Sequence, residues 1–122
     1  MFVSGMLSGS AQAKTGVSYI GKGYPNTRAG VWCVQHSLNY IFSTMDIHHA
    51  QIAEDSLFGP QTEEAIRYLQ ANDANWYTDV DGVVGPATGS TLYAWGDPKF
   101  NYSEAGTNGY CYWNLPTEGV WG

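Results

Sequence analysis

Apolar side chains recur at spacings of three and four residues in several stretches of the chain, and this spacing places them on one face of a helix. In the first stretch the stripe consists of Val31, Val34, Leu38 and Ile41, which predicts a helix over residues 29–43. Two shorter stretches follow the same rule further along. The pattern therefore predicts an all-α fold that contains three helices.

The second and third predicted helices each begin at a proline that directly follows a glycine. Pro60 opens a helix over residues 60–71, and Pro86 opens a helix over residues 86–95. Proline suits the first turn of a helix because its missing N–H has no partner there in any case. We expect Trp95 to be buried with the third helix.

The remaining segments carry weaker signals. Residues 43–56 form a connector, of which residues 47–54 could make a short helical turn. Residues 96–122 are rich in Gly, Asn and aromatic residues and form an irregular C-terminal extension. Within it, residues 110–113 predict a short strand that pairs with a segment such as 100–103.

An internal repeat is the most specific feature of the sequence. Two segments match at an offset of 26 residues, with two apolar residues between Asp and Gly in each copy. The repeated positions are Asp55, Gly59, Pro60 and Thr62 in the first copy and Asp81, Gly85, Pro86 and Thr88 in the second. Asp accepts backbone N–H groups in tight turns, and Gly allows a turn where a side chain would clash. Each copy therefore predicts a corner that leads from a loop into a helix.

Three linked motifs carry a resemblance to a known family. They are Val34-Gln35-x-x-Leu38, then Asp-x-x-Phe-Gly-Pro-x-Thr-x-x-Ala-Ile-x-x-Leu-Gln over 55–70, then Asp-Gly-Val-Val-Gly-Pro-x-Thr over 81–88. Over residues 29–95 the chain resembles the three-helix peptidoglycan-binding module of bacterial and phage cell-wall hydrolases. The resemblance implies a compact three-helix bundle with two related loop–helix units, and binding to the cell wall. Residues 96–122 lie outside it.

Composition excludes several other functions. The chain has 122 residues, which suits one domain, and its net charge is −6 with only five Lys and Arg residues. Nucleic-acid binding depends chiefly on Lys and Arg, so we predict no nucleic-acid partner. No stretch approaches the roughly 20 apolar residues of a membrane span. Aromatic residues make up 15% of the chain, and such rings either fill a small core or present faces to a polar ligand.

Two cysteines and the N-terminus bear on where the protein works. Cys33 and Cys111 are either free thiols or one disulfide, and we favour the disulfide of an exported protein. Residues 1–13 end in a small-x-small pattern, as does the end of a signal peptide, although a flexible Gly/Ser-rich terminus would look similar. Residues 14–28 form an N-terminal arm. We expect a secreted or cell-envelope protein.

No arrangement of residues predicts catalysis. Glu63 and Glu64 are adjacent, so on a helix they point about 100° apart and do not form a catalytic pair. His48, His49 and Asp46 lack the spacing of a metal-binding motif. We therefore predict a protein that is not an enzyme and has no cofactor or metal.

The resemblance implies binding instead, and we expect it to use a shallow groove of aromatic and hydrogen-bonding side chains. The candidates are Trp76, Tyr77 and Asp79 in the loop before the second corner, and Trp32, Gln35 and Tyr68 on the helices. Gln35 has a second interpretation, as a buried residue that caps a helix. The expected ligand is peptidoglycan, through its glycan or its stem peptide, and a separate wall hydrolase or another protein is a further candidate partner. The alternative function is a protein-interaction or scaffold module in phage, spore or envelope assembly.

Overall fold

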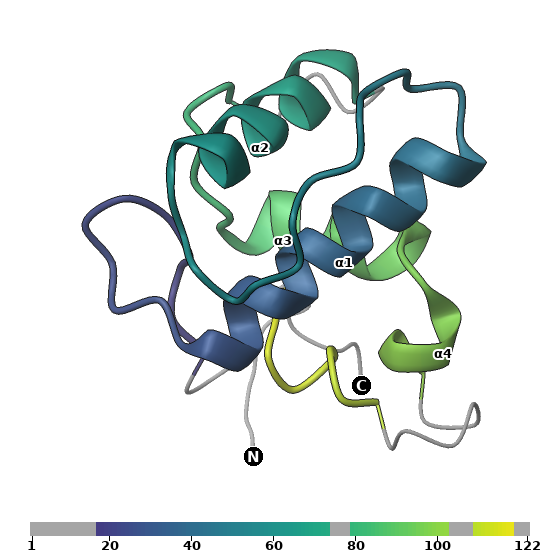
Figure 1. Ribbon diagram of the computed structural model, residues 1–122. Coiled ribbons are helices and arrows are strands. Elements are labelled where there is room, and N and C mark those ends of the chain that lie inside the picture. The colour runs from purple at the N-terminus through teal and green to yellow at the C-terminus, as the bar shows by residue number, and fades with distance from the viewer. Residues whose placement is uncertain (1–16, 74–78, 103–108, 119–122) are drawn as a thin grey trace.

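The computed structural model describes residues 17–73, 79–102 and 109–118, and its elements are helices (Figure 1). The helices are α1 (Arg28–Thr44), α2 (Pro60–Asn72), α3 (Pro86–Trp95) and the short α4 (Pro98–Asn101). The predicted all-α fold is confirmed, and the three predicted helices begin and end within one residue of their expected bounds. No helix in the described ranges is both long and apolar enough to cross a membrane.

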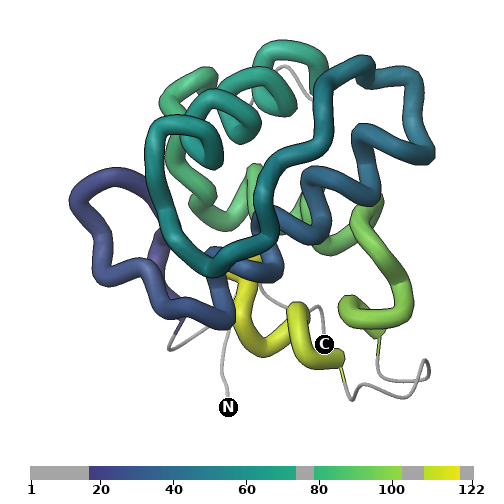
Figure 2. Tube along the Cα trace, in the orientation of Figure 1, coloured from purple at the N-terminus to yellow at the C-terminus, as the bar shows by residue number. Residues whose placement is uncertain are grey.

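Helix α1 forms the centre of the molecule, with α2 and α3 packed against it. Its buried face includes the predicted stripe of Val31, Val34, Leu38 and Ile41. The N-terminal arm joins this core through Ile20, which is buried and exchanges two backbone hydrogen bonds with Val84. Figure 2 shows the arm curving beside the first turn of α1 and the connector passing across the helix.

The first repeated corner is fixed by one buried amide on α1. The side-chain nitrogen of Gln35 donates to Asp55 Oδ1 at 3.0 Å, to the Leu57 carbonyl at 3.1 Å and to Thr62 Oγ1 at 3.0 Å. The side-chain oxygen of Gln35 accepts the Ser56 N–H at 2.9 Å. A single glutamine therefore binds the loop before α2 and the first turn of α2 together.

The second corner repeats this arrangement with a glutamine from α2. The Gln70 nitrogen donates to Asp81 Oδ1 at 3.0 Å, to the Val83 carbonyl at 3.0 Å and to Thr88 Oγ1 at 3.1 Å. Its oxygen accepts the N–H groups of Asp81 and Gly82 at 3.1 and 3.0 Å. The repeat in the sequence is thus a repeat of one hydrogen-bonding unit, in which α1 and α2 each carry the glutamine that fixes the next corner.

The aspartate of the first corner also accepts a backbone N–H, at 3.0 Å from Leu57. This bond, followed by the one from Gln35, holds the pKa of the Asp55 carboxyl below its ordinary value. The ionised carboxylate is the better acceptor, so the corner favours the charged form of Asp55.

The segment after α4 reverses direction in consecutive turns over residues 109–114. The predicted strand over 110–113 is therefore wrong. The turn contacts α4 instead through a hydrogen bond of 2.9 Å from the Cys111 N–H to the Phe100 carbonyl. The Cys33–Cys111 disulfide holds this turn on α1, as expected. Leu115 is fully buried, so the C-terminal extension contributes to the same core.

A glycine in the middle of α3 allows this extension to pack closely. A side chain at Gly89 would overlap the carbonyl oxygen of Pro116, so the backbones of the two segments lie directly against each other. Glycine is a poor helix former in general, but here its lack of a side chain allows the C-terminal extension to pack against α3.

Two other expectations are corrected. Residues 47–54 make no helical turn, because the Asn39 side chain bonds both the N–H and the carbonyl of Ile52, each at 2.8 Å, and keeps the connector extended. Trp95 is 56% exposed instead of buried. The face of α3 toward α1 is occupied by Leu92 and by the close approach of Gly96 to Ser37, which leaves no space there for an indole.

Candidate functional site

The middle of helix α1 is largely buried, and its partly exposed side chains form a single row. From residue 30 to residue 42 every side chain is buried except Trp32, His36 and Tyr40. These residues are four apart, so they lie one above the next on the helix, and the exposed Thr44 continues the row. We call Trp32, His36, Tyr40 and Thr44 the α1 ridge.

A groove of about 470 Å³ lies at the N-terminal end of the ridge, and we call it the Trp32 groove. It is lined by Trp32, by Ser56 of the first corner, by Phe100 of α4 and by Tyr110. The Trp32 ring lies edge-on to the rings of Phe100 and Tyr110, at centroid distances of 5.1 and 6.2 Å. The groove therefore combines three aromatic rings with a hydroxyl group, brought together from four parts of the chain.

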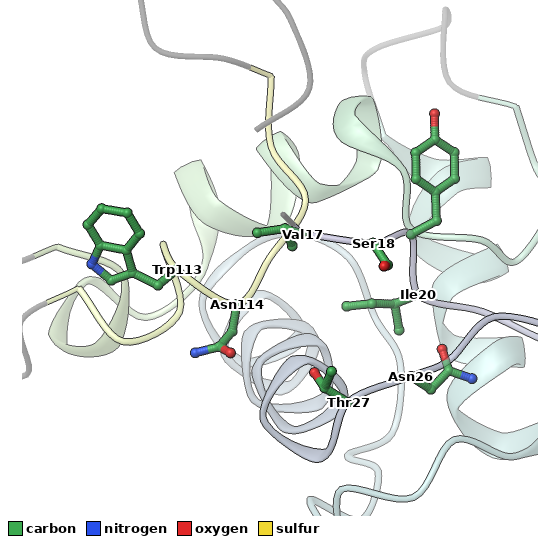
Figure 3. A pocket seen from close by; sticks show the side chains of 8 residues that line it. Val17, Ser18, Ile20, Asn26, Thr27, Trp113 and Asn114 are labelled. Carbon is green, nitrogen blue, oxygen red and sulfur yellow. The ribbon is translucent and has the colours of Figure 1, made fainter. Parts of the chain in front are cut away.

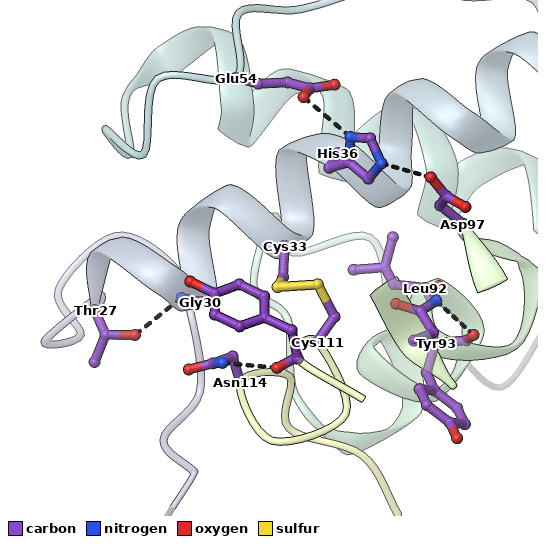
Figure 4. The surroundings of a disulfide bond; sticks show 12 residues. Thr27, Gly30, Cys33, His36, Glu54, Leu92, Tyr93, Asp97, Cys111 and Asn114 are labelled. Carbon is purple, nitrogen blue, oxygen red and sulfur yellow. Dashed lines mark hydrogen bonds and ion pairs between the residues drawn. A yellow bond between two sulfur atoms is a disulfide. The ribbon is translucent and has the colours of Figure 1, made fainter. Parts of the chain in front are cut away.

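His36 lies next to the Trp32 groove, where it joins three segments. Its ring stacks on Trp32 at a centroid distance of 4.6 Å. Its Nδ1 lies 3.0 Å from Glu54 Oε1 in the connector, and its Nε2 lies 2.8 Å from Asp97 Oδ2 before α4 (Figure 4). A carboxylate oxygen can only accept, so the ring makes both bonds when both nitrogens carry a hydrogen.

A second groove, of about 490 Å³, lies at the C-terminal end of the ridge, and we call it the Trp95 groove. Its lining residues come from α1, α3 and α4 and from the residue directly after each of them. They are Tyr40, Thr44, Met45, Ala94, Trp95, Gly96, Pro98 and Tyr102. Helix α4 thus lies between the two grooves, with Phe100 in one and Pro98 in the other.

This arrangement has the chemistry of a site for a polar ligand with apolar faces. Aromatic rings pack against the C–H faces of such a ligand, while carboxylates and hydroxyl groups bond its polar edges. The carboxylates of Glu54 and Asp97 contact His36, which stacks on Trp32, and these contacts fix their positions. Across the described ranges, no group of three His, Cys, Asp or Glu side chains is arranged so that it could hold a metal ion.

Two smaller hollows lie elsewhere on the surface. One, of about 100 Å³, has the N-terminal arm on one side and Trp113 and Asn114 on the other (Figure 3). Another, of about 230 Å³, lies at the second corner beside Asp79 and Asp81. Both are below the roughly 300 Å³ at which small-molecule sites begin, so the two grooves on the ridge are the better candidates.

The predicted binding residues are distributed over separate places. Trp32 lies in the groove that bears its name, and Asp79 is exposed at the second corner. Tyr68 contacts the rings of Phe42 and His49, a cluster that it does not share with Trp32. Trp76 and Tyr77 lie outside the described residues.

One predicted ligand contact is corrected outright. Gln35 is only 1% exposed, and its amide bonds the first corner at both its nitrogen and its oxygen. It has no polar group left to offer a ligand, and the burial expected in the alternative interpretation is confirmed.

Several groove residues did not emerge from the sequence. Tyr40 and His36 follow Trp32 at intervals of four, and this spacing of ring side chains could have been noticed. Phe100 and Tyr110 carry no local signal, because the disulfide and α4 bring them to α1 from a distant part of the chain.

Comparisons of the chain with protein-family models, with curated proteins and with solved structures found no match to any of them. The functional argument therefore rests on the residues and contacts described above.

Proposed function

We propose that this protein binds bacterial cell-wall peptidoglycan without cleaving it, and that the Trp32 groove contacts the polymer. The proposal rests above all on the α1 ridge, because the otherwise buried middle of α1 leaves an indole, an imidazole and a phenol partly exposed in one row. Peptidoglycan consists of sugar rings that carry N-acetyl groups and short peptides. Its sugars offer apolar C–H faces to aromatic rings and hydroxyl and amide groups to acceptors.

The surroundings of the Trp32 groove support this choice of ligand. Glu54 and Asp97 can accept hydrogen bonds from sugar hydroxyl or amide groups, and the Ser56 hydroxyl can donate or accept one. Because the carboxylates are already oriented by His36, binding costs little conformational entropy at these side chains. The sequence motifs of the two corners agree with this proposal, since they are the ones that resemble wall-binding modules.

Co-sedimentation with insoluble peptidoglycan sacculi tests the proposal, with cellulose, whose sugars carry no N-acetyl groups, as the control polymer. We expect the chain to sediment with sacculi and to release no soluble sugar from them. Tyr110→Ala should weaken retention about tenfold, the loss of one aromatic contact worth about 1.4 kcal/mol. Tyr24→Ala is the matched control, because Tyr24 and Tyr110 are both 42% exposed but Tyr24 lies outside the groove.

Two other results would contradict the proposal, either in the ligand or in the place where it binds. A folded chain that stays in the supernatant with sacculi contradicts wall binding and favours the protein-interaction or scaffold role. Retention that is equally weakened by both tyrosine variants would show that the groove is not where the polymer is bound.

A further inference from the structure

The two grooves lie at opposite ends of one ridge, and this placement bears on the shape of the ligand. We infer that the ligand is an extended glycan strand that lies along α1, from the Trp32 groove across His36 to the Trp95 groove. The inference rests on the proposed function and adds to it the part of peptidoglycan that is recognised: the sugar chain, not the stem peptide.

The length of the ridge exceeds that of a single sugar. Trp32 and Thr44 are twelve residues apart on one helix, a distance of about 18 Å at 1.5 Å per residue. A single sugar ring occupies only one groove. A strand of several sugars contacts both grooves, and its middle part passes over His36.

The Trp95 groove has the side chains that a neutral sugar needs. Three of its lining residues, Tyr40, Trp95 and Tyr102, provide aromatic rings, and Thr44 adds a hydroxyl group. None of its lining residues carries a charge. Trp95 is 56% exposed, so more than half of the residue's surface is open to a ligand.

Charge distinguishes the glycan strand from the stem peptide. The protein has a net charge of −6, and Glu54 and Asp97 flank the middle of the ridge. Stem peptides carry free carboxylates, which these groups repel, whereas the sugar chain presents hydroxyl and N-acetyl groups that carboxylates can accept from. Charge complementarity therefore favours the glycan strand along this face.

Titration with soluble N-acetylglucosamine oligomers, from the dimer to the hexamer, tests the inference by calorimetry. We expect the affinity to rise with chain length until both grooves are filled and then to level off. Trp95→Ala should weaken binding of the hexamer about tenfold and leave binding of the shortest oligomer unchanged. Trp95→Phe keeps a ring and should restore most of the loss.

The control is Trp113→Ala, which removes an indole that is 65% exposed but lines neither groove. Both tryptophans are largely exposed, so their removal leaves the core intact, and a circular dichroism spectrum checks this for each variant. We expect the control to bind all oligomers as the parent chain does.

Three results would overturn the inference. The first is an affinity that does not depend on oligomer length, and the second is a Trp95→Ala variant that binds the hexamer as Trp113→Ala does. The third is tighter binding of purified stem peptides than of the hexamer. If the chain still sediments with sacculi in these cases, the proposed function stands and only the strand along α1 is wrong. If the chain also fails to sediment with sacculi, both the proposed function and the strand along α1 are wrong.

Discussion

Replacing Gln70 by leucine tests whether the repeated corners are held by their glutamines. Leucine has a similar size but makes no hydrogen bond, so the variant removes the three bonds that the Gln70 nitrogen donates and the two that its oxygen accepts. Asp81 is exposed and recovers water, whereas the Thr88 hydroxyl and the Gly82 N–H are buried and do not. At about 1–3 kcal/mol for each buried group left without a partner, the expected loss is about 3 kcal/mol.

Thermal and urea unfolding followed by circular dichroism measure this loss, which should lower Tm by roughly 10 °C in a chain of this size. Gln61→Leu is the control, because Gln61 is exposed and its oxygen accepts one long bond, 3.4 Å from the Ala53 N–H. It should change stability by less than about 0.5 kcal/mol. A Gln70→Leu variant as stable as this control would refute the reasoning and show that the loop holds the corner without the amide.

Other substitutions and conditions give further expectations for stability. Gly89→Ala should destabilise the chain by about 2 kcal/mol or more in urea unfolding, despite the better helix propensity of alanine, whereas Gly59→Ala, which meets no atom within 4 Å, should be nearly neutral. Equal stability of these two variants would contradict the close packing of α3. Removing the disulfide by Cys33→Ser with Cys111→Ser should cost about 4 kcal/mol, since the bond spans a sequence separation of 78, and a loss below about 1 kcal/mol would show that it is dispensable. Because the folded chain lowers the pKa of Asp55, its contribution to stability is present above about pH 4 and disappears as the pH falls through the lower folded-state pKa. An acid titration of Asp55→Asn should therefore lack this part of the pH dependence, and a curve parallel to that of the parent chain would exclude it.

The helices could be predicted because their signals are local. The apolar stripe from Val31 to Ile41 and the Gly-Pro starts at Pro60 and Pro86 each act within a few residues, and the structure follows them closely. The corners were also visible as a repeat. The hydrogen bonds that hold the corners could not be predicted, because Gln35 and Gln70 lie 20 and 11 residues before the aspartates that they bind.

The candidate site was much harder to predict, because it depends on which faces the rest of the chain covers. Trp32 is on the side of α1 that the apolar stripe leaves free, but Gln35 is nearby in sequence and is buried by the first corner. Nothing local distinguishes these two residues. Trp95 presents the reverse case, since its spacing from Leu92 suggests burial and the close approach of Gly96 prevents it.

The disulfide has a consequence for affinity as well as for folding. Trp32 directly precedes Cys33 and Tyr110 directly precedes Cys111, so the bond joins two walls of the Trp32 groove. The glutamine bonds of the two corners involve neither cysteine, whereas Tyr110 is directly next to one of them. We expect a reducing solution to open the groove before it unfolds the helices. The oxidation state of the surroundings would then determine whether this surface can hold a ligand.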